Sequence, residues 1–176
     1  MKCVGIIGGL GPEATVGYYN KIISLASERW EYKKPVIVIY SFDEGKFADL
    51  VEFNKDYDKL KVLLSNTIEK LYLSGADFGL LACNTAHIFF DELEEDSPIP
   101  LLSISDAAAE EAVDRGMNKV GLLGTKTTIK GGFYQKSFEE KGIHVIIPEE
   151  EQKEYVHRKI VDEMVKGVMK NDTREE

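Results

Sequence analysis

The chain has 176 residues, with 22 basic and 31 acidic side chains and a formal charge of −9. This negative balance argues against nucleic acid or an anionic membrane surface as a partner, because both attract basic proteins. The apolar runs are too short to span a bilayer and the two cysteines do not make a disulfide framework, so we expect a cytoplasmic protein without a membrane segment.

The predicted elements alternate between short apolar strands and amphipathic helices. An unbroken apolar run such as 35–40 is typical of a parallel strand covered on both faces. The predicted strands, in chain order, are 2–8, 35–40, 78–82, 98–102, 119–124 and 144–147. The predicted helices are one from Pro12 through Leu25, then 60–72, 85–94, 106–115, 131–140 and 156–169. Polar residues predict a loop at 41–54 and a turn at 125–129. The alternation predicts an α/β fold wound around parallel sheet.

Part of the sequence repeats. Gly5-Ile-Ile-Gly8 and the Tyr-Asn-Lys that follows at 19–21 resemble Gly121-Leu-Leu-Gly124 and the Tyr-Gln-Lys at 134–136. The repeat predicts two similar α/β halves, 1–103 and 104–176, which would present their turns to each other across a cleft. The second half would lack its last strand and helix, because the counterpart of Cys83 would fall beyond residue 176. The alternative is that any two βα units look alike.

A glycine turn follows the first predicted strand. Gly9-Leu10-Gly11-Pro12-Glu13-Ala14 fits the G-x-G-x-x-A pattern of dinucleotide-binding proteins. That pattern expects an acidic residue about 20 positions later, and Asp43 comes about ten residues too late. Pro12 also lacks the backbone N–H that a phosphate would need. The turn therefore leaves three alternatives: a nucleotide site, a site for a small anion or amino acid, or a tight turn alone.

The sequence Cys83-Asn84-Thr85-Ala86-His87 leaves the end of a predicted strand, where open α/β sheets bind ligands. A cysteine at a helix N-terminus is near the positive end of the helix dipole, which favours the thiolate. Asn84 and Thr85, with the free N–H groups of the first turn, are suited to a carboxylate. The alternative is an inert buried cysteine beside a capping threonine. His87 is placed to face Cys83, or has a structural role.

The second half has a comparable turn, Gly124-Thr125-Lys126-Thr127-Thr128. Its hydroxyl groups suit an anion and suit helix capping equally well. Lys166, on the last predicted helix, either points into a cleft between the halves or is a surface lysine. No spacing of His and Cys predicts a metal site, and Cys3 is interpreted as a packing residue because it begins its strand at the opposite edge of the sheet.

The motifs at 5–15, 82–87 and 123–128 together resemble the aspartate/glutamate racemase superfamily, and most closely its aspartate racemase and broad-specificity amino-acid racemase branch. The resemblance covers essentially the whole chain, and it implies two pseudo-symmetric, Rossmann-like parallel-sheet halves with the active site between them. It implies an isomerase that uses no pyridoxal phosphate or other cofactor and acts on a small amino acid. Two cysteines on opposite faces of the substrate exchange the α-proton in such enzymes.

The resemblance implies a role for particular residues. Cys83 matches the first catalytic cysteine, and the loop at 8–13, with Gly9, Leu10 and Gly11, lines the pocket. The positions that match those holding the substrate's carboxylate, amino group and side chain are Asn84, Thr85, Thr125, Thr127 and Lys166.

Two departures from the family pattern bear on function. The second catalytic cysteine is absent from these 176 residues, so we expect the chain as given not to racemise efficiently. Aspartate-specific members carry an arginine after the second strand, whereas the stretch 43–54 offers Lys46 and several acids. An open sheet edge in a truncated second half predicts a homodimer. A nucleotide-binding α/β domain and a catalytically silent binder of an acidic small molecule are the alternative functions.

Overall fold

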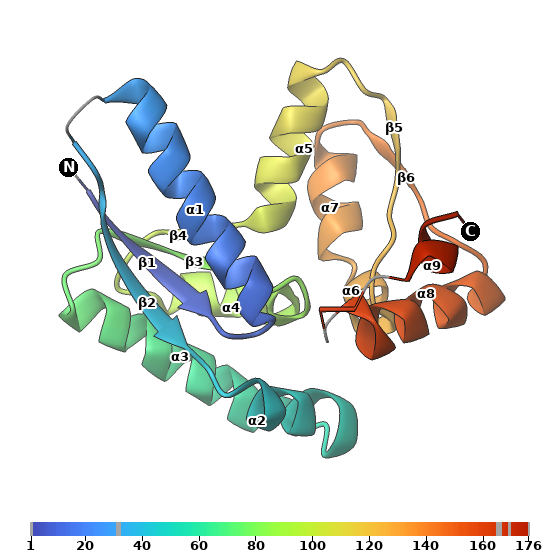
Figure 1. Cartoon of the computed structure of the whole chain (residues 1–176), viewed down its shortest axis with the longest axis horizontal. Coiled ribbons are helices and arrows are strands. Elements are labelled where there is room, and N and C mark those ends of the chain that lie inside the picture. The colour runs from blue at the N-terminus through green and yellow to red at the C-terminus, as the bar shows by residue number, and fades with distance from the viewer. Residues whose placement is uncertain (1, 31–32, 165–166, 169, 176) are drawn as a thin grey trace. The chain divides into compact units, whose positions relative to one another are not determined.

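A computed structural model describes residues 2–30, 33–164, 167–168 and 170–175. By its internal contacts the chain divides into two compact units, Met1–Ser103 and Ile104–Glu176. Each unit contains parallel strands connected through helices, which confirms the predicted α/β fold class (Figure 1).

The first unit is built on a four-stranded parallel sheet in the order β2-β1-β3-β4. Its strands are β1 (Cys3–Gly8), β2 (Val36–Ser41), β3 (Phe78–Leu81) and β4 (Leu101–Leu102). Its helices are α1 (Pro12–Arg29), α2 (Glu44–Ala48), α3 (Tyr57–Leu73) and α4 (Phe90–Glu95). A π-helical turn, Asp49–Phe53, follows α2, and a 3-10 turn, Thr85–Phe89, precedes α4. The central strand β1 is buried along its whole length.

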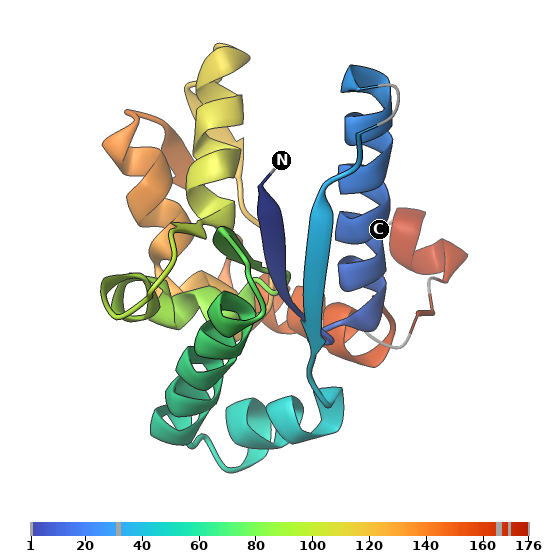
Figure 2. The same cartoon turned by 90° about the vertical axis from the view of Figure 1, so that its left-hand side faces the viewer.

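Two cores form on opposite faces of this sheet, because successive side chains of a strand point to opposite sides. Val4 and Ile6 of β1 pack on the face that carries α1. Ile7 packs on the other face, against α3 residues that include Leu64 and Ile68. Figure 2 shows α1 and α3 on the two sides of β1 and β2. Packing on both faces of β1 thus positions the loops that leave the carboxyl edge of the sheet.

The second predicted strand differs from expectation in its environment. β2 lies at the edge of the sheet, and Val36 and Ile39 keep 60% and 39% of their surface exposed. The interpretation that an unbroken apolar run marks a strand covered on both faces is therefore wrong for β2. Valine and isoleucine are common in strands whether or not both faces are buried, so the apolar run at 36–39 indicates a strand without indicating how far it is buried.

The predicted loop at 41–54 is helical over most of its length. Asp43 caps α2, since its carboxylate accepts hydrogen bonds from the backbone N–H groups of Gly45 (3.0 Å) and Lys46 (3.4 Å). The π-helical turn that follows buries Leu50 and Val51 in the α3-side core. The acidic residues Asp49 and Glu52 on either side of this apolar pair concealed the helical spacing.

The second unit is smaller and pairs two parallel strands, β5 (Lys119–Gly121) and β6 (His144–Ile146). Its helices are α5 (Ile104–Asp114), α6 (Lys126–Gly131), α7 (Phe133–Glu140), α8 (Glu150–Asp162) and α9 (Asn171–Glu175). Ala109 and Ala112 of α5 pack against Phe138 of α7 and Ile143 in its core. None of the helices described for residues 2–175 is both long and apolar enough to cross a bilayer.

Two expectations for the second unit are wrong. The residues after Thr125 form a helix, α6, because the Thr125 hydroxyl caps it by accepting from the Thr128 N–H (3.2 Å). The last predicted helix, 156–169, instead begins at Glu150 with a capping box and ends at Asp162. The chain then turns at Gly167, which has a positive φ of 68° that favours glycine.

Gly17 is a position at which the helix propensity of α1 can be raised without a steric clash. A Cβ built on Gly17 meets no atom within 4 Å, and the residue lies in the middle of the helix. Gly17→Ala is therefore expected to raise the free energy of unfolding by about 0.5–1 kcal/mol, because alanine restricts the unfolded chain and has the higher helix propensity. Urea unfolding measures this, and an unchanged or lower midpoint would contradict it.

Candidate active site

Three loops of the first unit leave the carboxyl ends of neighbouring strands and lie along one edge of the sheet. Backbone hydrogen bonds tie them to the sheet: the Phe42 N–H donates to the Gly8 carbonyl (2.9 Å), and the Ala82 N–H donates to the Ile7 carbonyl (2.8 Å). The loops are 9–11 after β1, 42–43 after β2 and 82–84 after β3. The structure therefore places the glycine turn beside the Cys83 turn, at the edge where open α/β sheets bind ligands.

Cys83 is half-buried two residues beyond the end of β3. Burial raises the pKa of its thiol to about 11, while hydrogen bonds from the backbone N–H groups of Ala86 and Thr85 act in the opposite direction. The expectation that the helix N-terminus favours the thiolate is thus only half right, because the N–H groups are present but desolvation outweighs them. With a pKa of about 11, the thiol is protonated at neutral pH.

The raised pKa makes stability depend on pH. In the unfolded chain the thiol ionises near pH 9.0, whereas in the folded chain Cys83 holds its proton to about pH 11. This contribution to stability is complete below pH 9 and is lost as the pH rises through 11. The wild-type chain is expected to lose on the order of 2 kcal/mol more than Cys83→Ala between pH 8 and 11. Urea unfolding of both proteins at a series of pH values measures the difference, and parallel curves would contradict it.

His87 is buried beside the Cys83 turn, residues 83–85. It is 1% exposed, its ring nitrogen Nδ1 lies 2.8 Å from the backbone carbonyl oxygen of Cys83, and its ring stacks on Phe90. The two rings are nearly parallel, at 2°, with centroids 5.3 Å apart. The burial and the stack agree with the structural role considered from the sequence, and the contact that His87 makes with Cys83 is to its backbone carbonyl.

The glycines of the first turn have different functions. A Cβ on Gly9 would lie 2.4 Å from the carbonyl oxygen of Phe42, and its φ is +77°. The Gly9 N–H donates to the hydroxyl of the buried Thr15 (2.9 Å). Leu10 is buried in the α3-side core, whereas Gly11, with φ +97°, has no atom within 4 Å of its Cβ position. Gly9 is therefore required for close packing, and Gly11 is the position with open space beside it.

The dinucleotide alternative finds little support in this geometry. In dinucleotide-binding proteins the acidic residue accepts a hydrogen bond from the ribose hydroxyl. The Asp43 carboxylate instead accepts from two backbone N–H groups and caps α2. Pro12 occupies the first turn of α1, as the sequence indicates. The close approach of loops 9–11 and 42–43 accounts for the first glycine of the pattern, Gly9, and the positive φ of 97° favours glycine at Gly11.

The second unit contains the remaining predicted site residues that the structure describes. Thr125 caps α6, and its hydroxyl oxygen also lies 3.0 Å from the hydroxyl oxygen of the buried Thr128. Thr127 is half-buried on the same turn. Lys126 forms an ion pair with Glu154 of α8, which lowers the pKa of that carboxyl. Lys166 lies outside the described residues.

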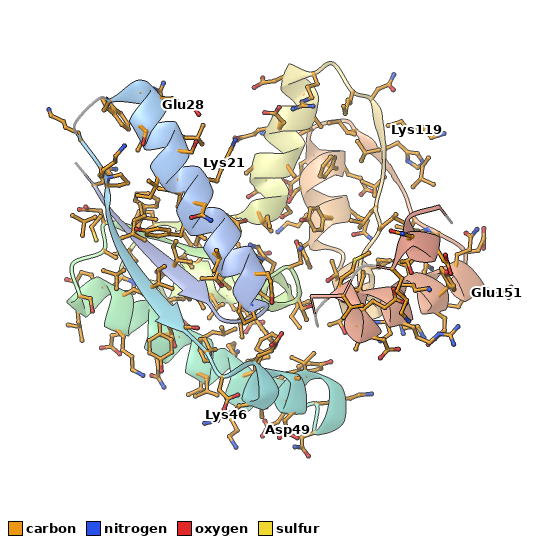
Figure 3. All side chains as sticks on the ribbon, viewed as in Figure 1. Lys21, Glu28, Lys46, Asp49, Lys119 and Glu151 are labelled. Carbon is orange, nitrogen blue, oxygen red and sulfur yellow. The ribbon has the colours of Figure 1, made fainter. Side chains whose placement is uncertain are left out.

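Cavities are present in both units. One of about 150 Å³ lies in the first unit between β2, α2 and α3, with Asp43 and Lys46 among its lining residues. The Lys46 side chain is exposed and points outward from α2 (Figure 3). A cavity of about 610 Å³ in the second unit is lined by residues such as Leu123, Tyr155 and Met164, and its described lining includes neither Thr125 nor Thr127. Within the described ranges no three His, Cys, Asp or Glu side chains form a group that could hold a metal ion.

Two structural contributors to the site were missed in the sequence. Thr15 supports the glycine turn, and Phe90 supports His87. The sequence contains a signal for each of them. A threonine in the first turn of a helix, such as Thr15, commonly forms hydrogen bonds with nearby backbone groups. Phe90 follows His87 by three residues, which places two rings on one face of a helix.

Comparison with known proteins identifies the family. Residues 7–176 match the family described as Asp/Glu/hydantoin racemase. The chain is 31% identical over 147 residues to the broad specificity amino-acid racemase RacX of Bacillus subtilis (strain 168), a match covering 81% of this chain and 63% of RacX. An aspartate racemase homologue from Pyrococcus horikoshii OT3 is 39% identical, with a TM-score of 0.80, over 99% of this chain and 76% of that one. The Picrophilus torridus aspartate racemase is 29% identical, with a TM-score of 0.74, over 99% and 71%.

The chain therefore spans less than two thirds of the length of RacX, and it matches the two solved structures over nearly all of its own residues. The sequence motifs, the parallel α/β fold and the family match agree. The chain belongs to the Asp/Glu/hydantoin racemase family.

Proposed function

We propose that this chain acts on the α-carbon of a small amino acid without a cofactor, and that Cys83 removes the α-proton on one face of the substrate. The observation that carries the proposal is the position of Cys83, which lies at the carboxyl edge of the sheet, beside the glycine turn, with backbone N–H groups directed at its sulfur. RacX is named as a broad specificity amino-acid racemase, and its likeness to this chain supports the substrate class.

The proposed chemistry is a proton transfer between carbon and sulfur. The Cα–H bond breaks, the S–H bond forms, and the electron pair is delocalised into the α-carboxylate. A thiolate whose conjugate acid has a raised pKa is a strong base but is scarce at neutral pH. The ammonium group of a bound amino acid supplies a positive charge that favours the thiolate. Substrate binding and activation of the base are thus coupled.

The other site residues are proposed to hold the substrate. Asn84 is exposed and Thr85 half-buried on the Cys83 turn, and both are proposed to bind the substrate's carboxylate or amino group. Gly9, Leu10 and Gly11 are proposed to line the pocket, with the open space at Gly11 as support. The family resemblance supports the same function for Thr125 and Thr127 of the second unit and a side-chain contact for Lys166.

We further propose that residues 1–176 supply a base on one face only. Cys3 lies at the opposite end of the sheet, where its backbone N–H bonds to the carboxylate of Asp77 (2.6 Å) at the start of β3. It is also buried in the sheet. A thiol on the second face therefore does not come from Cys3.

Assembly and location are part of the same proposal. Exposed apolar side chains on α1, Val16 and Leu25, and Trp30 at its C-terminal cap support a homodimer, because patches of this kind favour association. Both cysteines are unpaired thiols, which supports a reducing, cytoplasmic location.

The proposal is tested by measuring proton exchange and racemisation separately. The 176-residue chain is incubated in D2O with single enantiomers of a panel of amino acids, and mass spectrometry follows deuterium at Cα while chiral chromatography follows inversion. We expect exchange with at least one amino acid and little inversion. Fast racemisation would contradict the single-base proposal. Thermal stabilisation by an amino acid without any exchange would instead identify a catalytically silent binder.

A further inference from the structure

The buried imidazole of His87 is not used by the proton transfer described above. Its Nδ1 atom lies 2.8 Å from the carbonyl oxygen of Cys83, and a carbonyl oxygen only accepts hydrogen bonds, so Nδ1 carries a proton and donates it. The backbone N–H of the same residue donates to the carbonyl of Asn84 (3.0 Å). His87 therefore holds two successive carbonyl groups, those of Cys83 and Asn84, through two different donors.

These bonds act on a turn that is weakly held by itself. Thr85–Phe89 is a 3-10 helix, a short form whose hydrogen-bond geometry is poorer than that of an α-helix. Within it the N–H groups of Thr85 and Ala86 form hydrogen bonds to the Cys83 sulfur. The peptide that carries the Cys83 carbonyl leads directly into this turn, so a rotation of that peptide would change where the two N–H groups lie relative to the sulfur.

The ring of His87 is itself fixed. It is 1% exposed and stacks on Phe90, the first residue of α4, with an interplanar angle of 2°. Because the ring cannot turn without disturbing this stack, the Nδ1–H group has a defined direction. The stack thus connects the orientation of the Cys83 peptide to the packing of α4.

We propose that His87 is a positioning residue for Cys83: its Nδ1–H group holds the Cys83 carbonyl and so keeps the N–H groups of Thr85 and Ala86 on the sulfur. This inference rests on the proposed function of Cys83 as the base. It differs from a purely packing role for His87, in which only the volume and the stacking of the ring matter.

A matched pair of substitutions separates the two roles. His87→Asn keeps an amide N–H donor near the position of Nδ1, whereas His87→Gln moves the amide donor toward the position of Nε2. Both replace the ring with a side chain that cannot stack in the same way, so they disturb the packing comparably. His87→Leu removes the donor and keeps an apolar side chain beside Phe90. All are made in a Cys3→Ala background, in which Cys83 is the only thiol.

The readout is the rate at which iodoacetamide alkylates Cys83 at pH 8, followed by mass spectrometry after circular dichroism has checked the fold. We expect His87→Asn to stay within about twofold of the parent and His87→Gln and His87→Leu to react about tenfold more slowly, which corresponds to one unit of thiol pKa. Equal rates for the Asn and Gln variants would overturn the proposal. Loss of the fold in all three variants would also overturn it, because His87 would then be a packing residue. If only His87→Leu fails to fold, the Asn and Gln pair decides.

This assay needs no substrate, so it fails or succeeds independently of the proposed reaction. Exchange of the substrate α-proton by the Cys83→Ala variant would remove the base proposal and leave the alkylation rates unaffected. Conversely, exchange that depends on Cys83 but is equally fast in the Asn and Gln variants would retain the base and remove the positioning role of His87.

Discussion

Replacing Gly9 with alanine is expected to lower the free energy of unfolding by about 3–5 kcal/mol. The new Cβ would lie 2.4 Å from the carbonyl oxygen and 2.5 Å from the backbone nitrogen of Phe42, and the φ of +77° is itself unfavourable for alanine. Backbone atoms cannot swing aside as a flexible side chain can, so the loops after β1 and β2 would have to separate. Urea unfolding followed by circular dichroism measures the loss.

Gly11→Ala is the matched control for this change. Gly11 has a positive φ of 97° in the same turn, but no atom lies within 4 Å of its Cβ position. It therefore reports the conformational cost alone, about 1–2 kcal/mol. If the two variants lose the same stability, the close approach of the Gly9 and Phe42 backbones is not what requires glycine at position 9.

Cys83→Ala and Cys83→Ser are each expected to reduce the exchange of the substrate α-proton by about 1,000-fold, the middle of the range of about 100- to 10,000-fold for loss of a positioned acid–base group. Alanine has no ionisable group, and the serine hydroxyl, although similar in shape, is far too weak an acid to form the base near neutral pH. The rate of deuterium incorporation, measured with the amino acid that the wild-type chain exchanges fastest, gives the effect directly.

Cys3→Ala is the control for the loss of a thiol elsewhere in the same unit. Cys3 is buried at the amino end of β1, at the edge of the sheet opposite to Cys83. We expect it to leave exchange unchanged. A loss in Cys3→Ala equal to that in Cys83→Ala would mean that the effect comes from the fold of the sheet and not from a base.

The sheet of the first unit could be predicted because its strands are short apolar runs. The buried strand β1 and the helix α3, with Leu60, Leu64 and Leu71 at helical spacing, fall where the pattern places them. The π-helical turn could not be predicted in the same way. Its stability depends on burying Leu50 and Val51 against α3, a contact made across a gap in the sequence.

The candidate site could be predicted at the level of its loops. Parallel strands end at one edge, so a glycine turn after one strand and a cysteine after the next but one are expected to meet there. The environment of the cysteine could not be predicted. The pKa of Cys83 depends on how much water the surrounding core excludes, and local sequence carries only the opposing contribution of the helix N-terminus.

Short capped helices are the other feature that residue patterns concealed. Asp43 and Thr125 both precede a helix of five or six residues, and each caps it through a side-chain oxygen. Polar residues of this type are shared by loops and helix caps, and the two are distinguished only by the apolar residues that follow. After Thr125, Ile129 supplies the buried position that a loop would not need.

The most direct test of the account is the exchange of each enantiomer separately, by the wild-type chain and by Cys83→Ala, with deuterium at Cα followed by mass spectrometry. A single thiolate on one face predicts that one enantiomer incorporates deuterium with its configuration retained, that its mirror image does not, and that Cys83→Ala exchanges neither. Equal exchange of both enantiomers, or exchange that persists in Cys83→Ala, would contradict the assignment of Cys83 as the base.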